Sequence, residues 1–168
     1  MLLALVIPRL PLVAALGGAP EGPVALGPPP LGEPRVGQPS AAAEAAGVRT
    51  GMRLGEALAL CPGLRLVPPD PVALGERAVR LLHGIDALGL PAEPIAPGRV
   101  LVDAAPGLRL HGGARRLVER LHELAESGEA IRIGAAPARF AALMAARLAR
   151  RRPRILAAEA VDPDQRER

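Results

Sequence analysis

The segment GVRTGMRLGEALALCP, residues 47–62, combines a bend, a helix and a stop within one short stretch. Gly47 and Gly51 supply the backbone freedom that a bend needs, and Thr50 is a candidate N-cap. Apolar residues then recur at the i, i+3, i+4, i+7 spacing of one helix face: Leu54, Ala57, Leu58 and Cys61. Pro62 and Gly63 end the helix. The pattern predicts a short amphipathic helix, and periodicity alone assigns it no function.

The composition sets broad limits on the fold and its partners. A chain of 168 residues suits one domain or two small ones, and 49% hydrophobic residues suffice for a sizeable core. All 21 basic residues are arginine, and the formal net charge of +4 permits binding to nucleic acid or another acidic surface without requiring it. Phe140 is the single aromatic residue, so the chain lacks the platforms on which single-stranded bases stack. We expect any contact with nucleic acid to be made to phosphates.

Cysteine usage and the N-terminus indicate the compartment. Cys61 is the one cysteine, which excludes an internal disulfide, suits a reducing cytoplasm and predicts a packing role. The apolar start, residues 1–7, has no basic region before it and is interrupted by Pro8, so it predicts a buried strand and not a signal peptide. No uninterrupted apolar run approaches the roughly 20 residues needed to cross a bilayer. We expect a cytoplasmic protein that does not contact membranes.

Local patterns predict alternating strands and helices. Strands are expected at residues 2–7, 64–67, 93–96, 99–104, 131–135 and 154–158, with a weak hairpin inside the Gly- and Pro-rich segment 17–39. Helices are expected at residues 41–46, 54–61, 71–88, 113–127 and 137–150. Ser40 and Asp70 are candidate N-caps, and Gly128 is a candidate stop.

The order of these elements indicates an α+β fold. When the insertion at 17–89 is set aside, strand, helix, hairpin, helix, strand and helix follow one another, which is typical of a ferredoxin-like domain with an inserted, mostly helical subdomain. We expect a sheet domain formed by residues 1–16 and 90–158. The insertion and its return helix occupy 17–89, and a flexible tail occupies 159–168.

Residues 47–62 closely resemble the GV..GM....A..LCP segment in the fingers of Y-family (translesion) DNA polymerases. The resemblance covers residues 2–158 and implies a polymerase palm with inserted fingers, without a thumb or little finger. At the palm hairpin the family pattern E-P-x-S-I-D-E-x-x-x-D aligns without a gap, because Glu93, Pro94 and Asp103 match on both sides.

The same alignment implies that the catalytic carboxylates are missing. Polymerases of this family hold two metal ions with carboxylates from the first strand and the hairpin. Pro8 stands at the metal-binding aspartate, and Gly98 and Arg99 stand at the catalytic Asp-Glu pair. Arg99 would place a positive charge where Mg²⁺ requires a negative one. Glu93 and Asp103 remain, at positions that look structural in the family, so we expect neither a metal nor a cofactor.

The nucleotide-binding positions are altered as well. The family reads S-Y-E-A-R in the fingers, with a Tyr and an Arg that meet the triphosphate; here Ala41 and Glu44 stand at those two positions. Arg139 keeps the first lysine of the family's G-I-x-x-N-K-x-L-A-K segment. Candidate phosphate-binding residues are those that share a helix face with it: Arg147, Arg150 and Arg151. The alternative interpretation of this group is a solvated charged face.

Two further groups carry weaker signals. The three histidines lack the spacing of a metal site and receive no role: His83, His111 and His122. Gly112 and Gly113 precede a helix, where such a pair either binds an anion or, more often, only caps the helix.

Within the Y family the chain most resembles the catalytically degenerate ImuB-like branch. That resemblance implies an adaptor in an inducible mutagenesis complex, with an error-prone replicative-type DNA polymerase and a RecA-like accessory protein as partners and weak DNA phosphate binding at most. Two alternatives stay open. One is a divergent polymerase that uses Asp103 and Glu93, and the other is a relic palm-fingers scaffold without a role on DNA.

Overall fold

The computed structural model describes residues 1–28, 31, 33–126 and 129–149, and the backbone of residues 154–155. Its contacts divide the chain into two compact units. The sheet unit comprises Met1–Val6, Leu82–Leu124 and the chain from Ile131 onward, and the insert unit comprises Ile7–Leu81 and Ala125–Ala130. Among the described helices, none is both long enough and apolar enough to cross a membrane.

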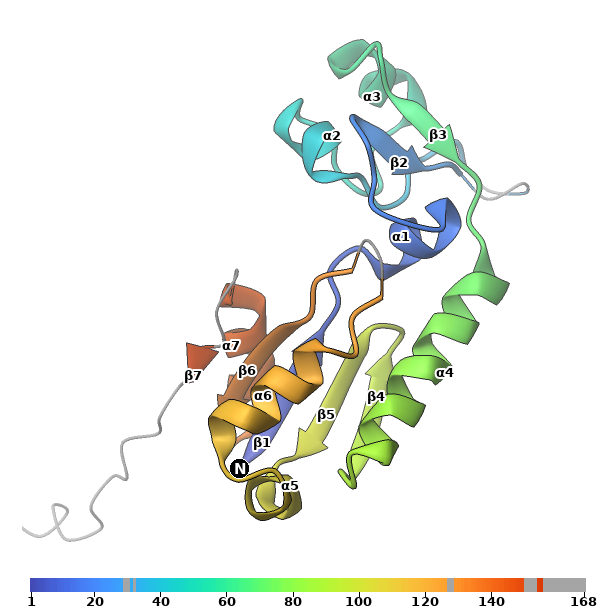
Figure 1. Ribbon diagram of the computed structural model, residues 1–168. Helices are drawn as coiled ribbons and strands as arrows, with labels where there is room; N and C mark the ends of the chain where they lie inside the picture. Colours follow the sequence, from blue (N-terminus) through green and yellow to red (C-terminus); the bar gives the residue numbers. More distant parts are fainter. Residues whose placement is uncertain (29–30, 32, 127–128, 150–153, 156–168) are drawn as a thin grey trace, which may run out of the picture. The chain divides into compact units, whose positions relative to one another are not determined.

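Strand β1 (Leu2–Val6) lies at the centre of a five-stranded sheet (Figure 1). It pairs antiparallel with β5 on one side and with β6 on the other, giving the order β4-β5-β1-β6-β7. The other strands are β4 (Ala92–Ala96), β5 (Arg99–Asp103), β6 (Arg132–Ala136) and β7 (Arg154–Ile155). The arrangement of β1, β4, β5 and β6 is that of a ferredoxin-like fold, which confirms the predicted α+β class.

Helix α7 (Arg139–Leu148) packs against one face of this sheet. It comes so close to β6 that a Cβ at Gly134 would lie 2.1 Å from the amide nitrogen of Ala146 and 2.4 Å from the carbonyl oxygen of Ala142. Only small side chains fit such an approach, so α7 turns its alanines to the sheet. Leu148, the last residue of α7, does not join this contact and is 57% exposed.

The opposite face of β1 carries Leu3 and Leu5, which are buried because alternate residues of a strand project to opposite faces. Helices contribute further buried side chains to the core of the sheet unit: Ile85, Leu117 and Leu121. These helices are the end of α4 (Pro71–Ala87) and α6 (Ala114–His122), and α5 (Ala105–Leu110) precedes α6.

Two elements of the sheet unit differ from the sequence prediction. Helix α5 was not predicted, although Pro106 in its first turn and Asp103 before it are both start signals. The Asp103 carboxylate accepts a hydrogen bond from the amide of Ala105 at 3.0 Å. Helix α6 ends at His122, earlier than predicted, and the predicted stop at Gly128 lies outside the described residues.

The insert unit is built around a small parallel sheet. Strand β2 (Val24–Leu26) pairs with β3 (Arg65–Val67), where the sequence predicted a hairpin within 17–39. The returning chain also runs antiparallel to β2, through a bridge between Ala25 and Pro39. Backbone hydrogen bonds of 2.7–3.1 Å flank this bridge, from Leu26 to Gln38, from Gly37 to Leu26 and from Ser40 to Val24. The predicted antiparallel return is therefore present beside β2, although it does not form a regular strand.

Ser40 ties this return to the next helix, α2 (Ala41–Ala45), as its N-cap. Among the described residues, Ser40 is the one polar residue that is buried as a whole, with 1% exposure. The hydroxyl oxygen accepts hydrogen bonds from the amides of Val24 and Ala43 at 3.1 and 3.2 Å and donates to the carbonyl of Gly22 at 2.9 Å. The predicted cap is confirmed, and Ser40 also anchors strand β2.

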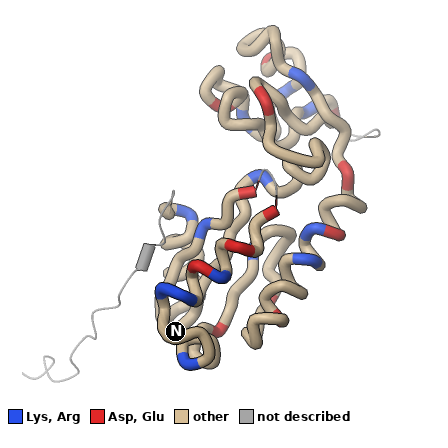
Figure 2. Tube along the Cα trace, in the orientation of Figure 1, with Lys and Arg blue, Asp and Glu red and all other residues tan. Residues whose placement is uncertain are grey.

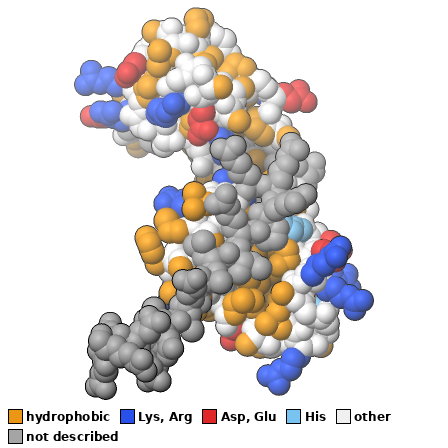
Figure 3. Space-filling view, turned by 90° about the vertical axis from the view of Figure 1, so that its left-hand side faces the viewer, with side chains coloured by type: hydrophobic (Ala, Val, Ile, Leu, Met, Phe, Trp, Pro, Cys, Tyr) orange, Lys and Arg blue, Asp and Glu red, His pale blue; other side chains and the backbone are white. Residues whose placement is uncertain are grey.

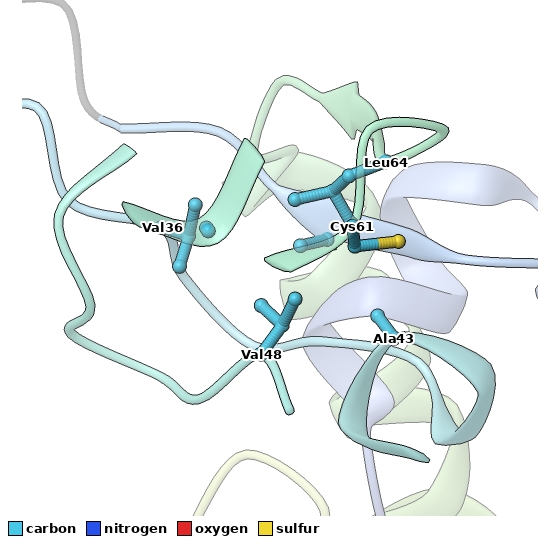
Figure 4. Close-up of a cluster of buried hydrophobic side chains, with 7 residues drawn as sticks. Val36, Ala43, Val48, Cys61 and Leu64 are labelled. Atoms are coloured by element: carbon cyan, nitrogen blue, oxygen red, sulfur yellow. The ribbon is translucent and has the colours of Figure 1, made fainter. Parts of the chain in front are cut away.

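Residues 47–62 contribute Val48, Ala57 and Cys61 to one buried cluster of the insert unit (Figure 4). Helix α3 (Leu54–Leu60) begins after Arg53 and not at Thr50, which instead lies in a turn closed by Gly51 at φ +83°. The buried cluster combines this stretch with neighbouring segments: Ala25, Val36, Ala43, Val48, Ala57, Cys61 and Leu64. Leu58 was predicted to be inside but is 38% exposed.

Helix α1 (Leu10–Leu16) was not predicted, and it belongs to the insert unit. Leu12 packs there with Val24 and Leu26, whereas the sequence assigned residues 1–16 to the sheet domain. The sheet unit gives way to the insert unit at Ile7 and resumes at Leu82, inside α4, in place of the expected boundaries after residues 16 and 89. Periodicity marks where a helix begins and ends, but not the core on which it packs.

Ion pairs join Glu126 and Glu129 to α4 within the insert unit. Arg77 lies 2.8 Å from a Glu129 carboxylate oxygen, and both side chains are nearly buried at 10% and 3% exposure. Arg80 donates to Glu126 at 2.5 Å. This hydrogen bond from Arg80, together with the charges of Arg80 and Arg77, lowers the pKa of Glu126 against the opposing effect of its partial burial.

The close approach of α7 to the sheet makes a specific prediction. Gly134→Ala is expected to lower the free energy of unfolding by about 3 kcal/mol, because the added methyl group meets backbone atoms that have no room to move. Gly75→Ala is the matched control, since a Cβ there meets nothing within 4 Å, and it should stabilise α4 by up to about 1 kcal/mol. Denaturant unfolding followed by circular dichroism measures both, and an unperturbed Gly134→Ala variant would contradict the packing.

Candidate functional site

The end of the central strand β1 is flanked by two arginines. Val6 lies opposite Arg99 of β5 and opposite Arg132 of β6. Residues directly opposite one another in antiparallel strands project from the same face, so both arginines share a face with Val6. The Arg132 side chain also donates to the carbonyl of Arg147 at 3.4 Å. This end of the sheet unit therefore carries concentrated positive charge.

The sequence predicts that catalytic carboxylates are lost at three positions, Pro8, Gly98 and Arg99. Arg99 begins β5, and Gly98 lies in the tight β4–β5 turn with φ +72°, a conformation that favours glycine. Pro8 follows β1 by two residues and belongs to the insert unit. None of the three supplies a carboxylate oxygen for a divalent cation.

The two remaining carboxylates of the hairpin are engaged in other contacts. Glu93 of β4 forms an ion pair with Arg139, at the start of α7. Asp103 accepts the amide hydrogen bond that begins α5. With Leu2 and Leu101, these residues line a small cleft of about 230 Å³. Among the residues that the structure describes, no three acidic, histidine or cysteine side chains lie close enough to hold a metal ion.

A second ion pair lies in the insert unit, between Arg9 and Glu44 of α2. The Arg9 Nε also donates to the carbonyl of Pro39 at 3.0 Å, so one guanidinium bridges the start of α1 and the segment before α2. Arg9 has φ +60°, the only positive value among the described residues other than glycine. Ala41, three residues before Glu44, is exposed and has no polar side chain to offer a ligand.

The four arginines proposed for phosphate binding are only partly described. Arg139 is paired with Glu93, so its charge is compensated locally. Arg147 is exposed on α7. Arg150 and Arg151 lie outside the described residues. In the described part of α7, Arg147 is thus the one arginine without an ion-pair partner, whereas the sequence predicted a helix face with four phosphate-binding arginines.

Sequence comparison decides the family. The model of the impB/mucB/samB family matches residues 20–147. The chain belongs to the impB/mucB/samB family. No curated protein sequence gives a significant match. The family model extends from the insert unit into α7, so it covers most of both units of this impB/mucB/samB chain.

Solved structures similar to this impB/mucB/samB chain are Y-family polymerases. A post-insertion binary complex of Dbh DNA polymerase has a TM-score of 0.77 and 14% identity, over 95% of this chain and 48% of that one. A Y-family polymerase chimera of Dbh and Dpo4 has a TM-score of 0.75 and 13% identity, over 94% and 49%. DinB from Sulfolobus solfataricus has a TM-score of 0.72 and 16% identity, over 94% and 48%. At these identities the likeness establishes the fold, and the chain spans about half the length of these polymerases.

The sequence of this impB/mucB/samB chain indicated Glu44, Arg99 and Arg139 but not the residues that lie beside them. Arg9 was not singled out, and Arg132 received no role. The one available signal for Arg9 was its charge, opposite in sign to that of Glu44, close to the expected first strand. The pairing itself joins residues 35 apart in sequence, and no local pattern encodes it.

The Arg9–Glu44 pair is expected to stabilise the insert unit by a modest amount. In a double-mutant cycle of Arg9→Ala and Glu44→Ala, the coupling energy should be about 0.5–1 kcal/mol, because the side chains are partly exposed at 25% and 44%. The cycle cancels the loss of the bond from Arg9 to Pro39.

The exposed pair of Arg115 and Glu119 on α6 supplies the control cycle, with an expected coupling of about 0.3 kcal/mol. Both cycles are measured by denaturant unfolding. A coupling for Arg9–Glu44 no larger than that of the control pair would contradict this role.

Proposed function

We propose that this impB/mucB/samB domain is a non-catalytic palm-fingers module that acts as an adaptor in DNA repair and translesion synthesis, as in the ImuB-like branch. The observation that carries the proposal is the placement of Arg99 and Arg132 on either side of Val6. Two-metal nucleotidyl transfer needs carboxylates at such a strand end to hold the cations. Two guanidinium groups there repel a divalent cation.

The nucleotide side supports the same proposal. Glu44 brings negative charge to the helix position where the resembling polymerases have a triphosphate-binding arginine, and like charges repel. Glu44 is held by Arg9, and Arg139 is held by Glu93. A triphosphate could use Arg9 or Arg139 only after displacing that arginine's own carboxylate partner.

The alternative of a divergent polymerase relies on Asp103 and Glu93 as relocated metal ligands. Both carboxylates already have partners, since Asp103 accepts a hydrogen bond from the amide of Ala105 and Glu93 pairs with Arg139. Arg139 beside Glu93 also lowers the attraction of this cleft for a cation. The adaptor is therefore the function that these contacts favour.

As an adaptor, the protein would act through protein contacts in an inducible DNA-damage (SOS) response. The partners that the ImuB-like assignment proposes are an error-prone replicative-type DNA polymerase and a RecA-like accessory protein. The proposed place of action is the bacterial cytoplasm, at the nucleoid while the complex works. A relic scaffold with neither partner is the remaining alternative.

Metal-dependent nucleotide binding tests the loss of catalysis. Calorimetric titration of a deoxynucleoside triphosphate in Mn²⁺ or Mg²⁺ is expected to give no metal-dependent heat, because Arg99 opposes the metal. The matched variant Pro8→Asp/Gly98→Asp/Arg99→Glu restores the carboxylates of the resembling polymerases and should gain Mn²⁺ binding.

Two outcomes would overturn the non-catalytic proposal. One is primer extension by the unaltered protein with either metal. The other is metal-dependent nucleotide binding that Glu93→Gln and Asp103→Asn abolish, which would favour the divergent polymerase.

Co-purification tests the adaptor role. Tagged protein recovered from DNA-damaged host cells is expected to carry an error-prone polymerase and a RecA-like protein, identified by mass spectrometry. Undamaged cells are the control, and less of both partners is expected there because the complex is inducible. Recovery of neither protein after damage would contradict the partner assignment and favour the relic scaffold.

A further inference from the structure

The turn between α5 and α6 forms an arginine-lined cleft in the sheet unit. It has a volume of about 600 Å³ and is lined by three arginines and a histidine against two glutamates. The arginines are Arg109, Arg116 and Arg120. Figure 3 shows basic side chains (blue) gathered along one edge of this unit's surface. Neither the catalytic resemblance nor the α7 arginines account for this surface.

The carboxylates near the cleft do not neutralise it. Glu123 pairs with Arg120 at 3.1 Å, and Glu119 pairs with Arg115 at 3.0 Å. Figure 2 shows acidic and basic residues interleaved along α6, as these pairs require. Arg109 and Arg116 form no ion pair with any carboxylate in the described part of the chain. Two positive charges in the cleft are therefore left for a ligand.

The glycine turn brings these two arginines together from different helices. Gly112 and Gly113 have φ values of +72° and +111°, which reverse the chain between α5 and α6. A Cβ at Gly112 would lie 3.2 Å from an Arg116 guanidinium nitrogen, so that side chain lies across the turn. The Gly113 amide already donates to the carbonyl of Leu108. The Gly113 amide is therefore not free for a ligand, and the charge that the cleft offers is that of its arginine side chains.

We propose that the α5–α6 cleft binds the phosphodiester backbone of nucleic acid through Arg109 and Arg116. The inference rests on the proposed role in DNA repair and names the surface by which that module contacts DNA. The lining favours phosphate over an acidic protein segment, because Leu110 is its one large apolar side chain and protein interfaces are built on apolar and aromatic cores. Phosphate contacts need only charge, and arginine suits them.

Fluorescence anisotropy of a labelled single-stranded oligonucleotide, and of its duplex, tests the proposal over a series of salt concentrations. The variant Arg109→Ala/Arg116→Ala is expected to bind about tenfold more weakly than the unaltered protein. Its salt slope for the single strand should fall by about 1.4, since each phosphate contact contributes about 0.7. Arg65→Ala is the control: this exposed arginine of β3 lies outside the cleft and contacts none of its carboxylates, so its loss should leave the slope unchanged.

Several outcomes would overturn the proposal. These are an absence of oligonucleotide binding, an unchanged affinity in the double variant, or a larger loss in Arg147→Ala on α7. Competition by poly-glutamate as effective as that by unlabelled oligonucleotide would assign the cleft to an acidic protein partner instead. Thermal melting confirms that the variants are folded.

Two results distinguish a failure of the proposed function from a failure of the cleft assignment. Primer extension by a protein that binds DNA through the cleft would overturn the non-catalytic role and leave the cleft assignment intact. Conversely, recovery of both protein partners by a chain that binds no oligonucleotide would overturn the cleft alone.

Discussion

The pairing of β1 on both sides is the constraint on which the rest of the structure depends. Its five residues hydrogen-bond to β5 and β6, which come from segments far along the chain, so the whole insert unit must leave and return before the sheet is complete. The register also fixes the chemistry of the strand end. A slip by one residue would turn Arg99 and Arg132 to the opposite face from Val6.

The parts of the fold that follow local rules could be predicted from the sequence. The apolar run Leu2–Val6, the turn at Gly98 and the cap at Ser40 each express one strong preference, and all three hold in the structure. Helices α1 and α5 escaped because they are short, so their periodicity is weak, and proline in the first turn resembles a loop signal. The parallel pairing of β2 with β3 depends on the packing of the insert unit, which no local pattern contains.

At the candidate site, too, the sequence could predict which residues are present but not which residues they contact. Alignment with a family motif could place Arg99 and Glu44, because identity at a position is a property of the sequence alone. It could not show that Glu44 meets Arg9, or that Arg139 meets Glu93 across 46 residues. Because Glu93 compensates the charge of Arg139, the arginines without an ion-pair partner in the described sheet unit lie elsewhere, at the end of β1, on α7 and on the α5–α6 turn.

The burial of Cys61 gives the insert unit a built-in reporter. It is the only thiol in the chain, is 7% exposed and packs in the same cluster as Val48 and Ala57. A thiol-reactive reagent reaches it only when that cluster opens, so the labelling rate reports the free energy of local opening in the insert unit. The sheet unit has no cysteine and does not contribute to this signal. Residues 47–62, which indicate the family most clearly, thus also contain a natural thiol that reports whether the insert unit opens cooperatively.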